Sequence, residues 1–171
     1  IVHGKISVMQ WKLIDISHIG EELVDWSEFL ASAELPTQYS SEHFFTDPFV
    51  HGGERFVIVA KDADKKIAAL MSGVRSGRAV TCGLPSRPQL FFRTNVDRLE
   101  ATRCLIDGLA KTFYPKLTQI VAWEKIDGIE SLGLKRADDT GNNEVVLLDL
   151  SLGYENLFKN FSSARRNGIR K

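Results

Sequence analysis

The spacing of apolar residues changes from one segment to the next over the first fifty residues. An apolar-rich run over 8–16 predicts a strand, and apolar residues at helical spacing predict a helix over 18–32 that ends before Pro36. The segment 37–50 mixes polar and aromatic residues, which predicts a loop that holds a short second helix. The chain therefore begins with a strand and two helices.

Three apolar runs follow, joined by short turns. The run 56–60 is continuously apolar, as in a strand covered on both faces, and 66–74 returns after an acidic turn. A tight turn at Ser76-Gly77 leads into a third run, 79–83. Three strands joined by tight turns predict an antiparallel meander.

The longest helical pattern follows a segment with two prolines. That segment, 83–94, is predicted to be a loop, and Thr94 or Asn95 is expected to cap a helix over 96–113. The remaining predicted elements are a strand over 117–123, a short helix over 126–132 ended by Gly133, strands over 134–137 and 144–150, and a closing helix from Ser151. This order predicts an α/β (α+β) fold, a three-layer mixed sheet with helices on both faces.

Composition narrows the class of protein. The 171 residues are 43% hydrophobic, enough for a sizeable core, and the 22 basic and 22 acidic residues give a net charge of zero. A generic nucleic-acid binder is usually basic, which this chain is not. Two cysteines make no disulfide framework, which suits a reducing compartment. No run of about 18 apolar residues is present, so we expect no membrane span.

The order of elements resembles the GNAT acyltransferase fold. The segment 130–135 (ESLGLK) is similar to the turn between that fold's last helix and its closing strands. Further on, 145–151 (VVLLDLS), 154–157 (YENL) and 163–171 (SARRNGIRK) resemble a junction of the FemAB-like proteins, and 38–49 resembles the loop after their first helix. FemAB-like proteins include aminoacyltransferases of peptidoglycan and acetyltransferases of cellulose or other exopolysaccharide synthesis.

This resemblance implies a domain organisation. FemAB-like proteins carry two tandem GNAT-like domains, so residues 1–150 are expected to form the first of them. Residues 151–171 are then its closing helix and the start of a truncated second domain. The resemblance also implies a bacterial cytoplasmic protein that acts on a small molecule or a cell-wall precursor.

One motif of the fold is missing from the sequence. A GNAT enzyme binds the pyrophosphate of CoA through a Gly-rich turn that opens a helix, because Gly lets the backbone approach phosphate. The corresponding stretch here, 85–95 (PSRPQLFFRTN), contains no Gly. Arg87 and Arg93 could hold an anion, but the cradle itself is absent. We therefore expect no cofactor in this chain, with acetyl-CoA or an aminoacyl donor such as aminoacyl-tRNA bound by the missing second domain.

Arginines form the first group of candidate substrate-binding residues. The members of this group on or beside the meander and the following loop, where guanidinium groups would hold a phosphate or a carboxylate, are Arg75, Arg78, Arg87 and Arg93. Arg166 and Arg170, four residues apart, share a face of a basic helical end that would contact an anionic substrate or a membrane surface, since wall precursors are lipid-linked. The alternative interpretation of both groups is ordinary surface charge, which near a helix C-terminus is also favourable.

The loop 38–49 supplies the second group. Tyr39 and His43 lie where the acceptor groove of this fold is lined, and they are candidates for contact with a sugar or a peptide, with structural roles as the alternative. For the three phenylalanines of the loop we favour closure of the core over the sheet edge: Phe44, Phe45 and Phe49.

The sequence does not identify the catalytic residues. Glu124, after the strand over 117–123, is a candidate base. Cys104 lies beside the apolar stripe of the long helix and is expected in the core rather than as a nucleophile. The four histidines show no metal-binding spacing, so we expect no metal site.

Three functional hypotheses stay open. The first is the N-terminal domain of a FemAB-like acyl- or aminoacyltransferase that acts on a cell-envelope or polysaccharide acceptor and lacks its own CoA site. The others are a non-catalytic GNAT-like binding module and a stand-alone, atypical N-acetyltransferase. No nucleic-acid partner is expected except tRNA as a donor. Phe158 and Phe161 have no evident partner, which points to a second domain or a homodimer.

Overall fold

The computed structural model describes residues 9–14, 17, 19–84 and 87–135, together with the single positions 156 and 159. The chain divides into two units, 1–139 and 140–171, and the elements below belong to the first. The strand predicted over 144–150 lies outside the described residues. Leu134 and Lys135, the described part of the strand predicted over 134–137, are not in a strand. Asn156 and Lys159, in the predicted closing helix, are helical.

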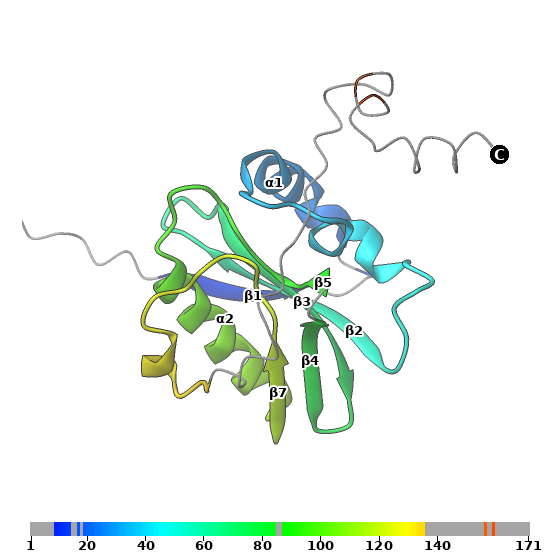
Figure 1. Ribbon diagram of the computed structural model, residues 1–171, viewed down its shortest axis with the longest axis vertical. Coiled ribbons are helices and arrows are strands. Elements are labelled where there is room, and N and C mark those ends of the chain that lie inside the picture. The colour runs from blue at the N-terminus through cyan, green and yellow to red at the C-terminus, as the bar shows by residue number, and fades with distance from the viewer. Residues whose placement is uncertain are drawn as a thin grey trace, which may run out of the picture. The chain divides into compact units, whose positions relative to one another are not determined.

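A seven-stranded mixed sheet forms the centre of the first unit (Figure 1). Strands β1 to β5 are neighbours in chain order, β6 pairs with β3, and β7 pairs with β4. Among the described strands, the pairing of β4 with β7 is parallel and the other pairings are antiparallel. The strands are β1 (Gln10–Ile14), β2 (Glu54–Lys61), β3 (Ile67–Ser76), β4 (Ala79–Leu84), β5 (Arg87–Pro88), β6 (Leu90–Phe92) and β7 (Leu117–Ile120).

Helices cover both faces of the sheet. Helix α1 (Ile19–Ser32) and the short 3₁₀ helices η1 (Gln38–Ser40) and η2 (Glu42–Phe45) lie on one face, and α2 (Arg98–Phe113) lies on the other (Figure 1). A further 3₁₀ helix, η3, spans Ile129–Leu132.

Alternate residues of β2 fill two separate cores. Val57 and Val59 pack with Trp26 and Phe29 of α1, whereas Ile58 packs on the opposite face with α2. Residues that alternate along a strand point to opposite faces, so a continuously apolar strand needs a cover on each. The prediction of a three-layer mixed sheet with helices on both faces is confirmed.

Two expectations about residues 83–97 are wrong. The segment predicted as a loop contains β5 and β6, and β6 pairs with residues 69–71 of β3. Its residues are buried because Phe91 faces the α1 core while Leu90 and Phe92 face the α2 core. Helix α2 is capped by Asp97, rather than by Thr94 or Asn95, because the Asp97 carboxylate accepts a hydrogen bond from the Glu100 N–H at 3.0 Å.

A row of charges docks α1 onto the sheet. The carboxylate of Glu22 is buried and lies 2.6 Å from the ammonium groups of both Lys12 on β1 and Lys61 on β2. Lys61 is also 3.2 Å from Asp25, one turn further along α1. Burial alone would raise the pKa of Glu22, but the hydrogen bonds from the two lysines outweigh it and leave the pKa below its usual range.

Replacing Glu22 by Gln should therefore lower the stability of the chain. We expect a loss of about 2 kcal/mol in the free energy of unfolding at pH 7, less than for a fully buried pair because Lys12 reaches solvent. The folded-state pKa is depressed, so this contribution exists above the unfolded pKa of about 4.3 and is lost as the pH falls through the folded value.

Urea unfolding at pH 7 and pH 3 measures this effect. The difference between the parent chain and Glu22→Gln should narrow at the lower pH. Glu28→Gln, which breaks an exposed pair with Lys66, is the control and should cost at most about 0.5 kcal/mol. A difference for Glu22→Gln that is the same at both pH values would contradict the role of the charge.

Candidate functional site

A groove of about 240 Å³ opens on the α1 face of the sheet, beside η1. Its walls come from η1, from the loop before β2, and from the ends of β3, β4 and β5. The lining residues are Tyr39, Phe49, Val50, His51, Gly52, Val74, Ser76, Ala79, Thr81, Gly83, Leu84, Arg87 and Gln89. Tyr39 and Arg87 are the residues among them that were candidates from the sequence, Tyr39 for acceptor contact and Arg87 for holding an anion.

The groove exists because the chain moves away from the edge of β3 after β4 and returns to that edge at β6. These two strands pair in succession with the same edge of β3, at residues 74–76 and 69–71. Between them, Gly83 pairs with Pro88 instead. Gly83 has a φ of +104°, and a Cβ there would lie 2.7 Å from the carbonyl oxygen of Arg87. A side chain at position 83 would therefore collide with the returning backbone.

The loop wall is held by a single arginine. The guanidinium of Arg55 donates to four backbone carbonyls, including those of Asp47 and Val50 at 2.7 Å each and those of Phe44 and Phe45. Hydrogen bonds from a charged donor are stronger than neutral ones. Arg55 therefore fixes the segment that carries Phe49 and His51 into the groove.

Tyr39 is positioned by buried hydrogen bonds on both sides. The indole N–H of Trp26 donates to the carbonyl of Ser40 at 2.6 Å, and the hydroxyl of Ser72 on β3 donates to the carbonyl of Tyr39 at 2.8 Å. The Thr37 side chain caps η1 and closes a capping box with Ser40. These bonds fix the backbone of η1 against the sheet, so the tyrosine side chain is presented at one wall.

Gln89 and Arg87 are among the polar side chains of the groove that have no partner in the described part of the chain. Gln89 is only 6% exposed, yet no described residue hydrogen-bonds its carboxamide. The half-buried guanidinium of Arg87 likewise has neither an ion pair nor a hydrogen bond there. The backbone of Gln89 is fixed, because its N–H donates to Val121 at 3.1 Å and its carbonyl accepts from Ser72 at 2.9 Å.

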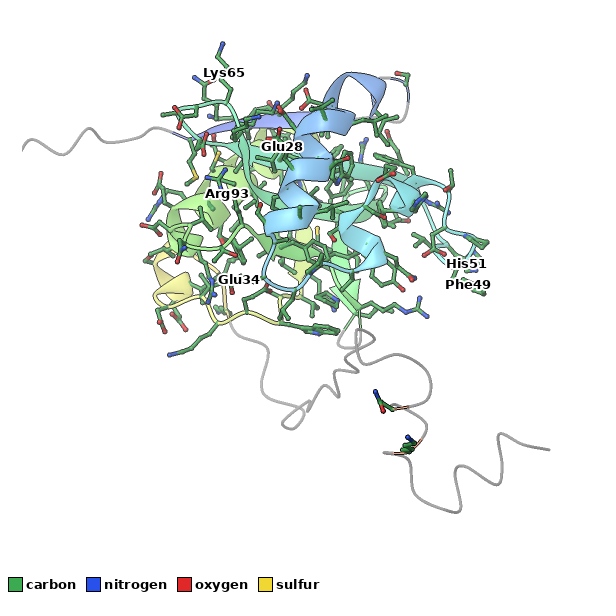
Figure 2. All side chains as sticks on the ribbon, turned by 90° about the horizontal axis from the view of Figure 1, so that it is seen from above. Glu28, Glu34, Phe49, His51, Lys65 and Arg93 are labelled. Carbon is green, nitrogen blue, oxygen red and sulfur yellow. The ribbon has the colours of Figure 1, made fainter. Side chains whose placement is uncertain are left out.

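The rim of the groove is apolar. Phe49 is 70% exposed and Leu84 is 49% exposed, and both line the opening. The expectation that Phe49 closes the core is wrong, whereas Phe44 and Phe45 are buried as expected. The N–H of Phe49 donates to the Asp47 carboxylate at 2.8 Å, which turns the segment outward. Figure 2 shows Phe49 and His51 together at the edge of the molecule.

The other candidate residues within the described part do not converge on the groove. His43 is exposed on η2, 3.9 Å from Glu42. Arg75 contacts Glu54 at 3.3 Å and lies over the ring of Phe113, 5.4 Å from its centroid. Arg78 donates to the carbonyl of Tyr114 at 3.3 Å.

Arg93 lies in another part of the sheet. It is 2.6 Å from the carboxylate of Asp62 and on the far side of the view from His51 and Phe49 (Figure 2). The structure therefore does not bring Arg75, Arg78 and Arg93 together. Arg166 and Arg170 lie outside the described residues.

A second hollow, at the start of α2, is acidic. It is lined by the carboxylates of Glu34, Asp97 and Asp127 and by two cations that are already paired. Arg98 donates to Glu34, and Lys125 lies 2.7 Å from Asp127. This hollow lies at the N-terminus of α2, the helix between β6 and β7.

Glu124 lies apart from the groove. It lines a hollow between the end of β7 and α2, with Leu90 and Thr102. One carboxylate oxygen, Oε1, is buried without a hydrogen-bond partner. Burial is the main cause that raises the pKa of this carboxyl. The predicted role of Glu124 as a base stays a prediction.

Gln89 and Gly83 were missed at the sequence level. Both lie in the segment 83–94, whose two prolines predict a loop, and a polar residue in a loop carries no signal of burial. The alternation of Arg87, Gln89 and Phe91 against Pro88, Leu90 and Phe92 is the pattern that could have revealed a strand with one polar face.

Replacing Gly83 by Ala should distort the groove. We expect a loss of about 2 kcal/mol in the free energy of unfolding, from the positive φ and the clash with Arg87. Gly77→Ala is a matched control, because Gly77 also has a positive φ but a Cβ added there would meet open space. It should cost about 1 kcal/mol. Equal losses in urea unfolding would contradict the close approach at Gly83.

The two thiols should be inert in the folded chain. Cys82 and Cys104 are free and buried. Burial raises the pKa of Cys82, and burial, with Asp107 and Glu100 nearby, raises the pKa of Cys104 to about 11. Iodoacetamide at pH 8 should alkylate neither thiol in the native chain but both in urea, as read by intact mass. Alkylation of the native chain at the rate of the unfolded one would contradict this.

Membrane-spanning helices and metal-binding clusters are both absent from the described residues. None of the helices in that part of the chain is long and apolar enough to cross a bilayer. Within the same residues, no cluster of three or more His, Cys, Asp or Glu side chains is placed to hold a metal ion.

Comparisons with known proteins add a distant structural likeness. No family model and no curated protein matches the sequence. A solved structure described as "Crystal structure of a probable acetyltransferase" is similar over 82% of this chain and 99% of that chain, with 14% identity and a TM-score of 0.44.

Proposed function

We propose that this chain is a GNAT-like acyltransferase domain that binds the acceptor in the groove beside η1 and does not itself hold acyl-CoA. In the finer form of the proposal, the chain is the N-terminal domain of a FemAB-like acyl- or aminoacyltransferase. Its acceptor would belong to the cell envelope or to a polysaccharide, and the donor would bind outside this chain. The resemblance of 145–171 and 38–49 to FemAB-like proteins supports this form.

The observation that carries the proposal is the chemistry at the start of α2. A pyrophosphate at a helix N-terminus is held by unpaired backbone N–H groups and by positive charge. Here Asp97 already accepts the N–H of Glu100, and three carboxylates line the hollow. Both cations of the hollow are paired, with Glu34 and with Asp127. These carboxylates would repel the negative charges of a bound pyrophosphate, which disfavours the binding of CoA at the start of α2.

The groove beside η1 has the opposite character. No acidic side chain lines it among the described residues, and Arg87 gives it a positive charge. It also carries unpartnered polar groups and an apolar rim, the combination that small-molecule sites share. A transferase that uses no covalent intermediate needs to position an acceptor. The buried thiols, Cys82 and Cys104, fit such a direct mechanism.

A non-catalytic binding module is the second candidate. The same groove favours it, because ligand binding there requires no donor. The two candidates differ in whether the bound ligand is modified when a donor and the rest of the transferase are supplied. A stand-alone N-acetyltransferase would instead need CoA to bind this chain tightly.

Acetyl-CoA should show no saturable binding to this chain. Calorimetry with up to about 1 mM acetyl-CoA should give only heats of dilution, because the start of α2 repels phosphate. In ¹⁵N-labelled chain, the amides of residues 98–100 should not shift. Micromolar binding with shifts at those amides would contradict the proposal and favour a stand-alone acetyltransferase.

A charge-reversed variant sharpens this test. Asp127→Lys adds positive charge to the hollow without touching the cap made by Asp97. It should leave acetyl-CoA binding weak if the missing Gly-rich cradle is the main obstacle, and raise it if charge is the main obstacle. The parent chain should remain a non-binder in either case.

A further inference from the structure

The most informative unassigned feature of the structure is the carboxamide of Gln89. It belongs to a residue that is more than nine-tenths buried, and it lines the groove without a hydrogen-bond partner among the described residues. The carboxamide atoms of Gln89 are not among the fully buried side-chain atoms that lack a hydrogen bond in the described residues, so they remain accessible to a partner from outside the chain. The open side of this carboxamide is the groove.

Arg87 stands two residues before Gln89 and lines the same groove. Alternate residues of an extended segment lie on the same face, about 7 Å apart along the backbone. The guanidinium has no ion pair or hydrogen bond with any described residue. A single planar guanidinium matches a carboxylate, which it binds through two parallel hydrogen bonds.

We propose that the groove recognises the N-acyl amino-acid group, in which a free carboxylate binds Arg87 and the neighbouring amide pairs with the carboxamide of Gln89. This inference deepens the proposed function, on which it rests for the use of the groove as a ligand site. The carboxamide of Gln89 is both a donor and an acceptor, so it pairs with the C=O and N–H of a secondary amide.

The remaining walls limit the size and polarity of the ligand. Val74, Leu84 and Phe49 offer apolar surface for a small side chain or acyl group. The groove has a volume of about 240 Å³. That space suits one or two amino-acid residues. The matching group occurs in free N-acylated amino acids and at the C-terminus of peptides.

Titration of the ¹⁵N-labelled full chain tests the proposal. The probes are N-acetylglycine, propionate for the carboxylate alone, N-acetylglycinamide for the amide alone, and inorganic phosphate. N-acetylglycine should saturably shift the amides of residues 81–84, 87 and 89 and the side-chain NH₂ of Gln89. The other three probes should bind at least about tenfold more weakly, because each loses one of two hydrogen-bonded contacts.

Variants separate the two contacts. Arg87→Gln and Gln89→Met should each weaken N-acetylglycine at least about tenfold, and Arg87→Gln should remove the advantage over N-acetylglycinamide. Arg103→Gln is the control, because Arg103 is an exposed residue of α2 paired with Glu100, and it should leave binding unchanged. A well-dispersed spectrum of each variant shows that it folds.

A longer probe distinguishes the two sources of the ligand. Tighter binding of N-acetyl-dialanine than of N-acetylglycine would identify a peptide C-terminus, and equal binding would identify a small N-acyl amino acid. The proposal is overturned if phosphate or N-acetylglycinamide binds as tightly as N-acetylglycine, or if 50 mM N-acetylglycine leaves the groove amides unshifted. The acetyl-CoA titration, which tests the proposed function, is read at the amides of residues 98–100. Its failure can therefore be told apart from a failure of the present proposal.

Discussion

The pairing of β3 with two successive strands is the constraint on which the candidate site depends. β4 and β6 use the same edge of β3, so the chain between them has to leave that edge and return. The close approach at Gly83 makes the return tight, and the backbone bonds of Gln89 to Ser72 and Val121 anchor its end. A pairing that ran without interruption would fill the space that the groove occupies.

Charge assigns different roles to different parts of this fold. Lysines and carboxylates between α1 and the strands β1 and β2 pair with each other and hold a structural layer in place. At the start of α2, carboxylates outnumber the cations, and each cation is paired with a carboxylate. In the groove, Arg87 and Gln89 have no partner among the described residues. The residues without partners, rather than the most highly charged ones, therefore mark the place at which a ligand would complete the structure.

The sequence predicts the layers of this fold better than its site. Continuous apolar runs such as 56–60 indicate strands covered on both faces, and the structure confirms two cores that share β2. The β6 strand was not predicted because Pro88, just before it, is typical of a loop. In the structure Pro88 belongs to the two-residue strand β5, where its missing N–H is tolerated. Phe49 was misjudged because an apolar residue in a loop is usually buried, whereas a turn at Asp47 directs this one outward.

The arginines show why site residues are harder to predict. Arg75, Arg78 and Arg93 have the residue type that an anion site needs, but each meets a separate partner that lies far away in the sequence. Pairing of this kind depends on strand register, which composition does not determine. Tyr39 was found because it belongs to a loop identified by resemblance. Arg87 was a candidate from its residue type, but that it shares a groove with Gln89 becomes recognisable only when the register of β5 and β6 is known.

The stability of Gln89→Met, measured by urea unfolding in the absence of ligand, tests the central claim most directly. If the carboxamide of Gln89 is reserved for a ligand, replacing it with an apolar side chain of similar length removes no hydrogen bond of the free chain. We expect a variant at least as stable as the parent. A loss of more than about 1 kcal/mol would show that the carboxamide already serves the protein. It would contradict the assignment of the groove as a site completed by a ligand.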